Sequence, residues 1–462
     1  MSARLLRALS LSLALALGAG AAEAASTAWI LTTDYSTFGR LRAVTAGDPT
    51  TVSGDLAVVP GDAVGRQHGG LVYVVGRGGS GVVQVYDPGA GFALLNEFSV
   101  GAAANPQDIA FDTAGEAYVP CYDQAVLLRI DPVTGTILGS YSTAAFADAD
   151  GLPETAWCVA DGDRLYIACQ KLDRANWYGP SGPGAILVFD MAAEAWVDLD
   201  PALPGVQPIV LAGGNPYTRL LIEGSTLSVG CAGWFGLADG GIERVDLDAG
   251  ASLGYAVTEG QLGGDVLAIE PDGGAWLALV ADASFRTSVR RAAAGGVTTL
   301  LAGNDWVHAD LWLADGRLHV LDRTIGASGL RVIDPVSGAD LGGGVIGTGL
   351  PPFLFVPAEA APAAAPVPAV ASLQVGPATP NPCNPRAQVA LQGRPGAVLA
   401  VSVVDVRGRR VASAGVVLDA RGQGGYVFRG VDAAGRALPA GVYRVLADDG
   451  SARAGTAVTL LK

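Results

Sequence analysis

The chain has 462 residues, of which 65 are glycine and 27 are proline, and half of it is apolar while only 16% is charged. This length is enough for two domains, and this composition excludes a disordered or collagen-like chain. The formal net charge of -15 repels polyphosphate, so we expect no nucleic-acid ligand.

The N-terminus has the pattern of a secretory signal peptide. Arg4 and Arg7 precede an apolar run over residues 9–17, after which small residues lead to Ala-Glu-Ala at 22–24. A buried N-terminal helix is the alternative, but it would leave the Ala-x-Ala ending without a reason. The run is shorter than the roughly 20 residues of a membrane-spanning helix, and no later segment is long and apolar enough. We therefore predict a signal peptide over residues 1–25, a secreted or cell-surface protein and no membrane span.

A unit of strand, turn, strand, loop and strand repeats along residues 26–356. A four-stranded propeller blade has a similar period, so the copies predict an all-β, seven-bladed β-propeller. Helical periodicity is nearly absent from this part of the chain. The strand that recurs, at positions about 42 to 62 residues apart by subtraction, lies near Trp29, Tyr73, Tyr118, Tyr166, Ser228, Leu277 and His319.

The first copy lacks an innermost strand, whereas a strand-like segment follows the last copy. This segment, residues 352–356, matches the innermost strands of the other copies. A propeller leaves no open edge when a strand from one end of the chain joins the blade at the other end. We therefore expect residues 352–356 to complete the first blade.

One copy also carries a family motif. Residues 118–121 read Tyr-Val-Pro-Cys, residues 128–132 read Leu-Arg-Ile-Asp-Pro, and residues 134–135 read Thr-Gly. This pattern resembles the YVTN-repeat family of bacterial β-propellers over roughly residues 26–356. The resemblance implies the fold and no particular activity, because such blades occur in proteins with many roles.

A second β domain follows the repeats. Residues 357–372 are rich in Ala and Pro, which predicts an extended linker, and residues 373–462 return to strand patterns. Asn-Pro-Cys-Asn-Pro at 381–385, Pro-Ala-Gly-Val-Tyr at 439–443 and the terminal Val-Thr-Leu-Leu-Lys resemble the C-terminal Ig-like module of exported bacterial proteins, which is related to FlgD-type Ig domains and type IX sorting domains. The resemblance implies a small Ig-like β-sandwich that places or sorts the chain at the cell surface. We expect its core to include Val401, Val403, Val406, Val442, Tyr443 and Val445.

The chain has five cysteines, so at least one is unpaired. Cys121, Cys169 and Cys231 end similar strands of different copies, and equivalent positions are normally held apart by a whole repeat. This spacing favours buried free thiols over a disulfide or a three-thiolate metal site, which are the alternatives. Cys383 stands where the family of the C-terminal module often has Phe, which indicates a packing residue.

The candidate binding face is formed by loops. In a propeller, the loops between blades and those between the second and third strands emerge on one face, around the central tunnel. Carboxylates, an arginine and aromatic side chains gather on these loops, and such a combination suits a protein or glycan ligand. The predicted binding residues are Asp123, Asp173, Arg174, Trp177, Tyr178, Trp234, Phe235, His308 and Asp310.

Two overlapping sets of oxygen ligands could hold a cation. Closely spaced carboxylates between residues 148 and 154 suit Ca²⁺, although Asp-Gly followed by Pro is also ordinary turn chemistry. Calcium-dependent lactonase propellers, which the second set resembles, hold one ion at the tunnel mouth with Glu, Asn and Asp from successive blades. An Asn-Pro turn is the alternative for that set. The candidate metal ligands are Asn105, Asp148, Asp150, Glu154, Asn215 and Asp265.

Catalytic motifs are weak. The chain has no Gly-x-Ser-x-Gly elbow, His308 beside Asp310 lacks a serine partner, and the glycine-rich segment 76–81 lies between strands and not before a helix. The sequence therefore favours an exported binding protein over an enzyme. The alternatives are a metal-dependent propeller hydrolase or lactonase with Ca²⁺ at the tunnel mouth, and a purely structural envelope protein.

Overall fold

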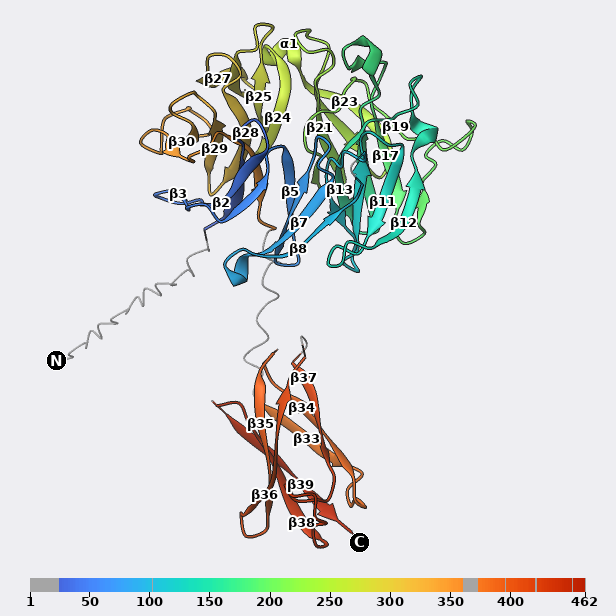
Figure 1. Ribbon diagram of the computed structural model, residues 1–462, viewed down its shortest axis with the longest axis vertical. Coiled ribbons are helices and arrows are strands. Elements are labelled where there is room, and N and C mark those ends of the chain that lie inside the picture. Colours follow the sequence, from blue (N-terminus) through green and yellow to red (C-terminus); the bar gives the residue numbers. More distant parts are fainter. Residues whose placement is uncertain are drawn as a thin grey trace, which may run out of the picture. The chain divides into compact units, whose positions relative to one another are not determined.

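The computed structural model describes residues 25–101, 103–359, 373–394, 396–419, 422–450 and 452–461. Residues 1–24 of the predicted signal peptide and residues 360–372 of the predicted 357–372 linker lie outside them. The chain divides into two compact units, residues 1–359 and 360–462, and both consist of strands (Figure 1). The described helical segments are η1 (Pro88–Ala90), η2 (Ala144–Phe146), η3 (Arg174–Asn176) and α1 (Glu259–Leu262). None of the described helices could cross a membrane.

The first unit is a series of antiparallel sheets, each described from its innermost strand outward. The first sheet is β32 (Pro352–Pro357), β1 (Thr27–Thr32) and β2 (Phe38–Thr45), with β3 (Thr51–Val52) and β4 (Ala57–Pro60) both on β2. The second is β5 (Ala63–His68), β6 (Leu71–Gly76), β7 (Val82–Asp87) and β8 (Ala93–Ser99). The third is β9 (Ala110–Phe111), β10 (Ala117–Cys121), β11 (Val126–Ile130) and β12 (Ile137–Ser142).

The fourth sheet is less regular than the others. It consists of β13 (Thr155–Asp161), β14 (Arg164–Cys169) and β17 (Ala185–Asp190), with β18 (Ala195–Trp196) and β19 (Ile209–Val210) both on β17. Within its long loop, β15 (Leu172–Asp173) pairs with β16 (Gly179–Pro180).

The remaining sheets of the unit again have four strands each. The next is β20 (Leu221–Glu223), β21 (Thr226–Cys231), β22 (Gly241–Asp246) and β23 (Ala251–Thr258). It is followed by β24 (Asp265–Asp272), β25 (Ala275–Ala281), β26 (Thr287–Ala293) and β27 (Gly296–Ala302). The last is β28 (His308–Ala314), β29 (Arg317–Asp322), β30 (Gly329–Ile333) and β31 (Ile346–Gly347). The recurring strand of the sequence is the second strand of every sheet, from β1 to β29.

The sheets close into a ring. The expected closure is confirmed, because β32 pairs antiparallel with β1, with Phe355 opposite Ile30 and Val356 opposite Trp29. Successive residues of a strand point to opposite faces of its sheet, so one face packs on the preceding sheet and the other on the next. Ile30 therefore joins the hydrophobic cluster shared with the last sheet, while Leu31 joins the cluster shared with the second sheet.

The same alternation holds around the ring, since every hydrophobic cluster of this unit is shared by two successive sheets. The N-terminal strands β2 and β3 lie beside the strands of the last sheet (Figure 1). Residues of the inner strands, residues just before them and residues just after the second strands line a central cavity. This arrangement is a β-propeller, and it explains why most of its second strands are buried along nearly their whole length.

The second unit has two sheets, β33 (Gln374–Thr379), β34 (Ala387–Gln392) and β37 (Gln423–Phe428) in one, and β36 (Arg410–Val417), β35 (Val398–Asp405), β38 (Gly441–Asp448) and β39 (Arg453–Leu460) in the other. Both sheets contribute to one core, which holds four of the six expected residues and Cys383. The expectation is wrong for Val406 and Val442, which are 81% and 45% exposed. Val406 lies in the turn after β35, and Val442 points to the opposite face of β38 from buried Tyr443.

All five cysteines are free and buried, as the repeat spacing favoured. Burial raises the pKa of the Cys121 and Cys169 thiols to about 12, so they stay protonated and behave as packing groups.

Candidate functional site

One side of the ring, which we call the loop face, carries the loops between second and third strands and the connections between sheets. These segments emerge together because consecutive strands of each sheet are antiparallel. Large exposed apolar side chains on one face are typical of surfaces that bind other molecules. On these loops they are Tyr35, Trp177, Tyr178, Phe235, Leu237, Phe285, Trp306 and Ile325, and Trp177 is 91% exposed.

Two long loops of this face, residues 170–184 between β14 and β17 and residues 232–240 between β21 and β22, contact each other. Trp234 lies over Gly179, where an added Cβ would come within 2.0 Å of the indole ring, so a larger residue there would displace the ring. Phe235 meets Tyr217 edge to face, with ring centroids 5.4 Å apart. Trp234 is therefore partly buried packing between loops, whereas Trp177 of the predicted binding residues projects freely.

Arg174 holds together the acidic residues that the sequence suggested for a cation or ligand. Its Nε donates to Glu154 Oε1 at 2.9 Å, its Nη1 to Asp123 Oδ1 at 2.8 Å, and its Nη2 to the Tyr122 carbonyl at 3.0 Å. Asp150 lies 3.9 Å from the same guanidinium. Burial tends to lower the pKa of Arg174, but the hydrogen bonds and charges of Glu154 and Asp123 outweigh it and raise the pKa. Arg174 and Asp123 thus bind each other across two neighbouring sheets.

Asp148, Asp150 and Glu154 do come together, with one oxygen of each within 4.8 Å of the others. Fully buried Glu154 also accepts the Leu172 N–H at 3.1 Å, and burial raises its pKa. The guanidinium of Arg174 already supplies positive charge at this cluster. Metal binding at this cluster stays a prediction. The cation that the structure places beside these carboxylates is the guanidinium of Arg174.

The wider set of candidate ligands is spread over separate turns. Asn105, Glu154 and Asn215 share a left-handed backbone, with φ of 47°, 43° and 51°, so they do occupy equivalent positions. Asn105 Oδ1 accepts the Gly78 N–H at 2.9 Å, and none of the three lines the central cavity. Asn tolerates this backbone region well, which supports the turn alternative.

Asp265 differs from these three residues. It begins β24 and accepts the Gly236 N–H at 2.8 Å, and burial raises its pKa to about 6. It does not line the central cavity either.

Two other predicted binding residues are used inside the fold. Asp173 caps η3 by accepting the Ala175 N–H at 3.0 Å. His308 is 2% exposed, and its Nδ1 lies 3.2 Å from Thr287 Oγ1. Burial lowers the pKa of His308 to about 4, so the ring is neutral near pH 7.

The expectation that Asp310 is a loop residue is wrong, because it lies within the inner strand β28 and is 3% exposed. Arg219 Nη2 donates to both of its carboxylate oxygens at 2.8 and 3.0 Å, and the N–H groups of Leu311 and Phe355 donate at 2.9 and 2.8 Å. Arg219 Nη1 also donates to the Phe355 carbonyl at 2.8 Å. Asp310 therefore joins the last sheet to the closing strand β32.

A second aspartate, Asp108, also forms a buried ion pair that joins different sheets of the ring. Asp108 is fully buried and binds Arg66 through both oxygens, at 2.9 and 2.6 Å. It also accepts the N–H groups of Ile109 and Cys158 at 2.9 and 3.0 Å, while Arg66 donates to the Cys158 carbonyl at 3.0 Å. Sequence reasoning missed both pairs, although Asp108 and Asp310 stand at matching places in their copies.

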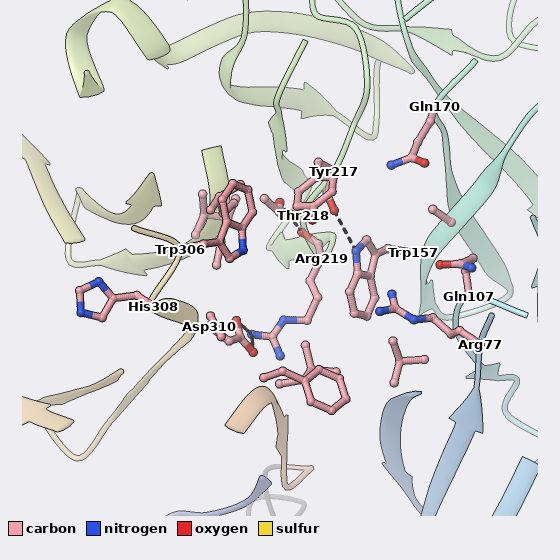
Figure 2. A pocket seen from close by; sticks show the side chains of 18 of the residues that line it. Arg77, Gln107, Trp157, Gln170, Tyr217, Thr218, Arg219, Trp306, His308 and Asp310 are labelled. Carbon is pink, nitrogen blue, oxygen red and sulfur yellow. Dashed lines mark hydrogen bonds and ion pairs between the residues drawn. The ribbon is translucent and has the colours of Figure 1, made fainter. Parts of the chain in front are cut away.

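The inner strands surround a central cavity of about 330 Å³, which sequence reasoning also missed. Figure 2 shows Arg219 near its middle, with Asp310 beside the guanidinium and Trp157 and Trp306 on either side. Trp157 Nε1 donates to the Tyr217 carbonyl at 2.9 Å, which fixes the indole ring. The polar and aromatic lining residues are Arg77, Gln107, Tyr122, Trp157, Gln170, Tyr217, Thr218, Arg219, Trp306, His308, Asp310, Arg323 and Phe353.

Neither a protein-family model nor a curated protein sequence matches the chain. Solved β-propeller structures do resemble it. PorZ, described as an essential bacterial surface component of the type-IX secretion system of Porphyromonas gingivalis, is 13% identical with a TM-score of 0.42, and the match covers 92% of this chain and 64% of that one. The chain thus spans less than two thirds of the length of PorZ.

Two other solved structures are similar to a comparable degree. Apo AztD from Citrobacter koseri is 10% identical with a TM-score of 0.43, over 88% of this chain and 99% of that one. Virginiamycin B lyase from Staphylococcus aureus is 11% identical with a TM-score of 0.40, over 59% and 80%. Because identity and superposition are both low, a functional conclusion has to rest on the chain's own geometry.

We expect Ca²⁺ at about millimolar concentration to leave the melting temperature of the wild-type chain unchanged, because the Arg174 guanidinium already binds Glu154 and lies beside Asp150. The variant Arg174→Gln should melt at a lower temperature and regain stability with Ca²⁺, since a cation that binds only the folded state stabilises it by mass action. The double variant with Glu154→Gln is the control and should lose the Ca²⁺ effect. A Ca²⁺-dependent rise in the wild type would instead support the calcium site. Differential scanning calorimetry measures each case.

Proposed function

We propose that the chain is an exported binding protein, a seven-bladed β-propeller followed by an Ig-like module, which binds a protein or glycan outside the cell through its loop face. The observation that carries the proposal is the set of exposed apolar loop residues on that face. Aromatic side chains offer large contact area at small entropic cost, so they are favoured where proteins bind other molecules. The acidic and arginine side chains that were the other candidate ligand-binding groups are bound to each other within the fold.

In this proposal, each of the seven large sheets of the first unit is one blade. The hydrophobic clusters shared by successive sheets join each blade to the next. The Ig-like module is the two-sheet second unit, whose role we propose to be placement of the propeller at the cell surface. A calcium-dependent hydrolase or lactonase is the less favoured function, because Arg174 occupies the acidic cluster and the Asn, Glu and Asp candidates lie outside the central cavity.

The loop-face function predicts that the double variant Trp177→Ser, Phe235→Ser loses at least about tenfold in affinity, since central aromatic residues often carry 2 kcal/mol or more of binding energy. The measurement is saturation binding of the labelled mature chain to host cells that lack the gene. Val133→Ser is the matched control, because Val133 is 63% exposed in the hairpin between β11 and β12, on the opposite side of the ring. Equal binding by all three proteins would contradict the proposal.

Two treatments extend the same assay. Protease or glycosidase treatment of the cells before binding distinguishes a protein ligand from a glycan ligand. A chain that ends after Glu359 should keep its affinity but shift from the cell-bound to the released fraction of its native host. An unchanged split between the two fractions would reject the placement role of the second unit.

A further inference from the structure

The lining of the central cavity is more positive than negative, although the whole chain carries a charge of -15. Arg77, Arg219, Arg323 and Asp310 line it. Arg219 and two backbone N–H groups satisfy Asp310. Arg77 has its own partner in Asp62, whose Oδ1 lies 2.8 and 2.6 Å from two of its nitrogens. The charge of Arg323 is then left over.

Arg323 has no counter-charge, since no carboxylate of the described residues lies within 4.0 Å of its guanidinium. The adjacent Asp322 is bound to Arg331 and Thr324, each at 2.5 Å. Arg323 Nη2 donates to the Trp306 carbonyl at 3.0 Å, but its Nε is buried without a hydrogen-bond partner. Burial lowers the pKa of Arg323, as expected for a cation that has lost water without gaining an anion. Such a donor is costly to leave unpaired, so an anion would complete the site.

The walls of the cavity suit a flat and partly polar body. Ring faces pack well against other flat faces, and amide groups both donate and accept hydrogen bonds. A volume of about 330 Å³ lies near the lower end of known ligand pockets, which fits a small molecule. The wall residues that a ligand would meet are Tyr122, Trp157, Tyr217, Trp306, Gln107 and Gln170 (Figure 2 labels all but Tyr122).

We propose that the central cavity binds a small organic carboxylate, with the charged group on Arg323 and a flat body among the aromatic walls. A planar carboxylate matches the fork of a guanidinium. One carboxylate balances the charge of Arg323, which is the one uncompensated cation. A phosphate monoester carries up to two negative charges near pH 7 and would leave excess negative charge in the cavity. The flat body is an aromatic ring or a pyranose ring. Either ring can carry a carboxylate that binds Arg323 in the same way. Trp306 lines this cavity and is also one of the exposed loop-face residues, but the proposed carboxylate contact is made by Arg323 and does not depend on the proposed loop-face function.

The test is isothermal titration calorimetry of the full mature chain with benzoate and with glucuronate, which separates the two kinds of flat body. Benzamide and glucose are the neutral counterparts, and inorganic phosphate is the competing anion. We expect one of the two carboxylates to bind with one site per chain, and to bind at least about tenfold more tightly than its neutral counterpart and than phosphate. Absence of carboxylate binding at millimolar concentration, or equal binding of the neutral counterpart, would overturn the proposal.

Variants locate the binding to Arg323. Arg323→Gln should weaken carboxylate binding by at least about tenfold and leave binding of the neutral counterpart unchanged, while Arg323→Lys should keep part of the affinity. Arg164→Gln is the matched control, because it removes the same charge from a partly exposed ion pair with Asp190. If Arg323→Gln does not fold, Trp306→Leu decides, since it removes one wall and keeps the cation. Unchanged affinity in the folded Arg323 variant, or in Trp306→Leu, would refute this placement.

Discussion

A chain that ends after Gly349 should lose at least about 5 kcal/mol of folding free energy and melt on the order of 10 °C lower, because it lacks the strand that closes the ring. β32 supplies the hydrogen-bonded neighbour of β1, and its Phe355 and Val356 are each 1% exposed in two different clusters. Without β32, β1 becomes an open edge. The last sheet also loses the apolar contact with Phe355 through which it packs on the first sheet. Thermal unfolding followed by circular dichroism measures the change.

The control for this truncation is a chain that ends after Glu359. It lacks the same second unit but keeps β32, so the difference between the two chains reports residues 350–359, which contain the closing strand. We expect it to melt close to the full-length propeller transition, since the core of the second unit is formed by its own strands. Equal melting of the two truncated chains would show that the ring is stable without closure.

The substitution Asp310→Asn should destabilise the propeller by about 2–4 kcal/mol, because removing one partner of a buried ion pair leaves the other charge uncompensated. Arg219 is 13% exposed and has no other carboxylate at hydrogen-bond distance among the described residues. The new amide can still accept from one backbone N–H, which keeps the effect below that of a full deletion. Urea unfolding of the folded variant gives the free energy directly.

Asp55→Asn is the matched control for Asp310→Asn. Asp55 also pairs with arginine, but it is 46% exposed, so water replaces the lost partner. An exposed pair contributes about 1 kcal/mol or less. Similar losses from the two substitutions would mean that the buried pair does not hold the ring together.

The sequence by itself determined the strands, their order and the closure of the first unit. Both faces of a sheet pack on neighbouring sheets, so the second strands are apolar runs bounded by turns, and this local pattern is visible without a structure. The unmatched strand at 352–356 had to pair with the incomplete first copy for the same reason, because an open edge in a closed ring would leave backbone groups unpaired.

The tertiary structure alone decided which polar side chains are available. Arg174 and Asp310 stand out in the sequence as candidate ligand residues, yet each is bound by a residue of another sheet, at distances in sequence of 51 and 91 residues. Arg323 gave no signal, because a lone arginine becomes a candidate anion site only when its surroundings lack a carboxylate. Charge pairing and cavity lining depend on which blades the ring brings together, and hydrophobic periodicity carries no information about that.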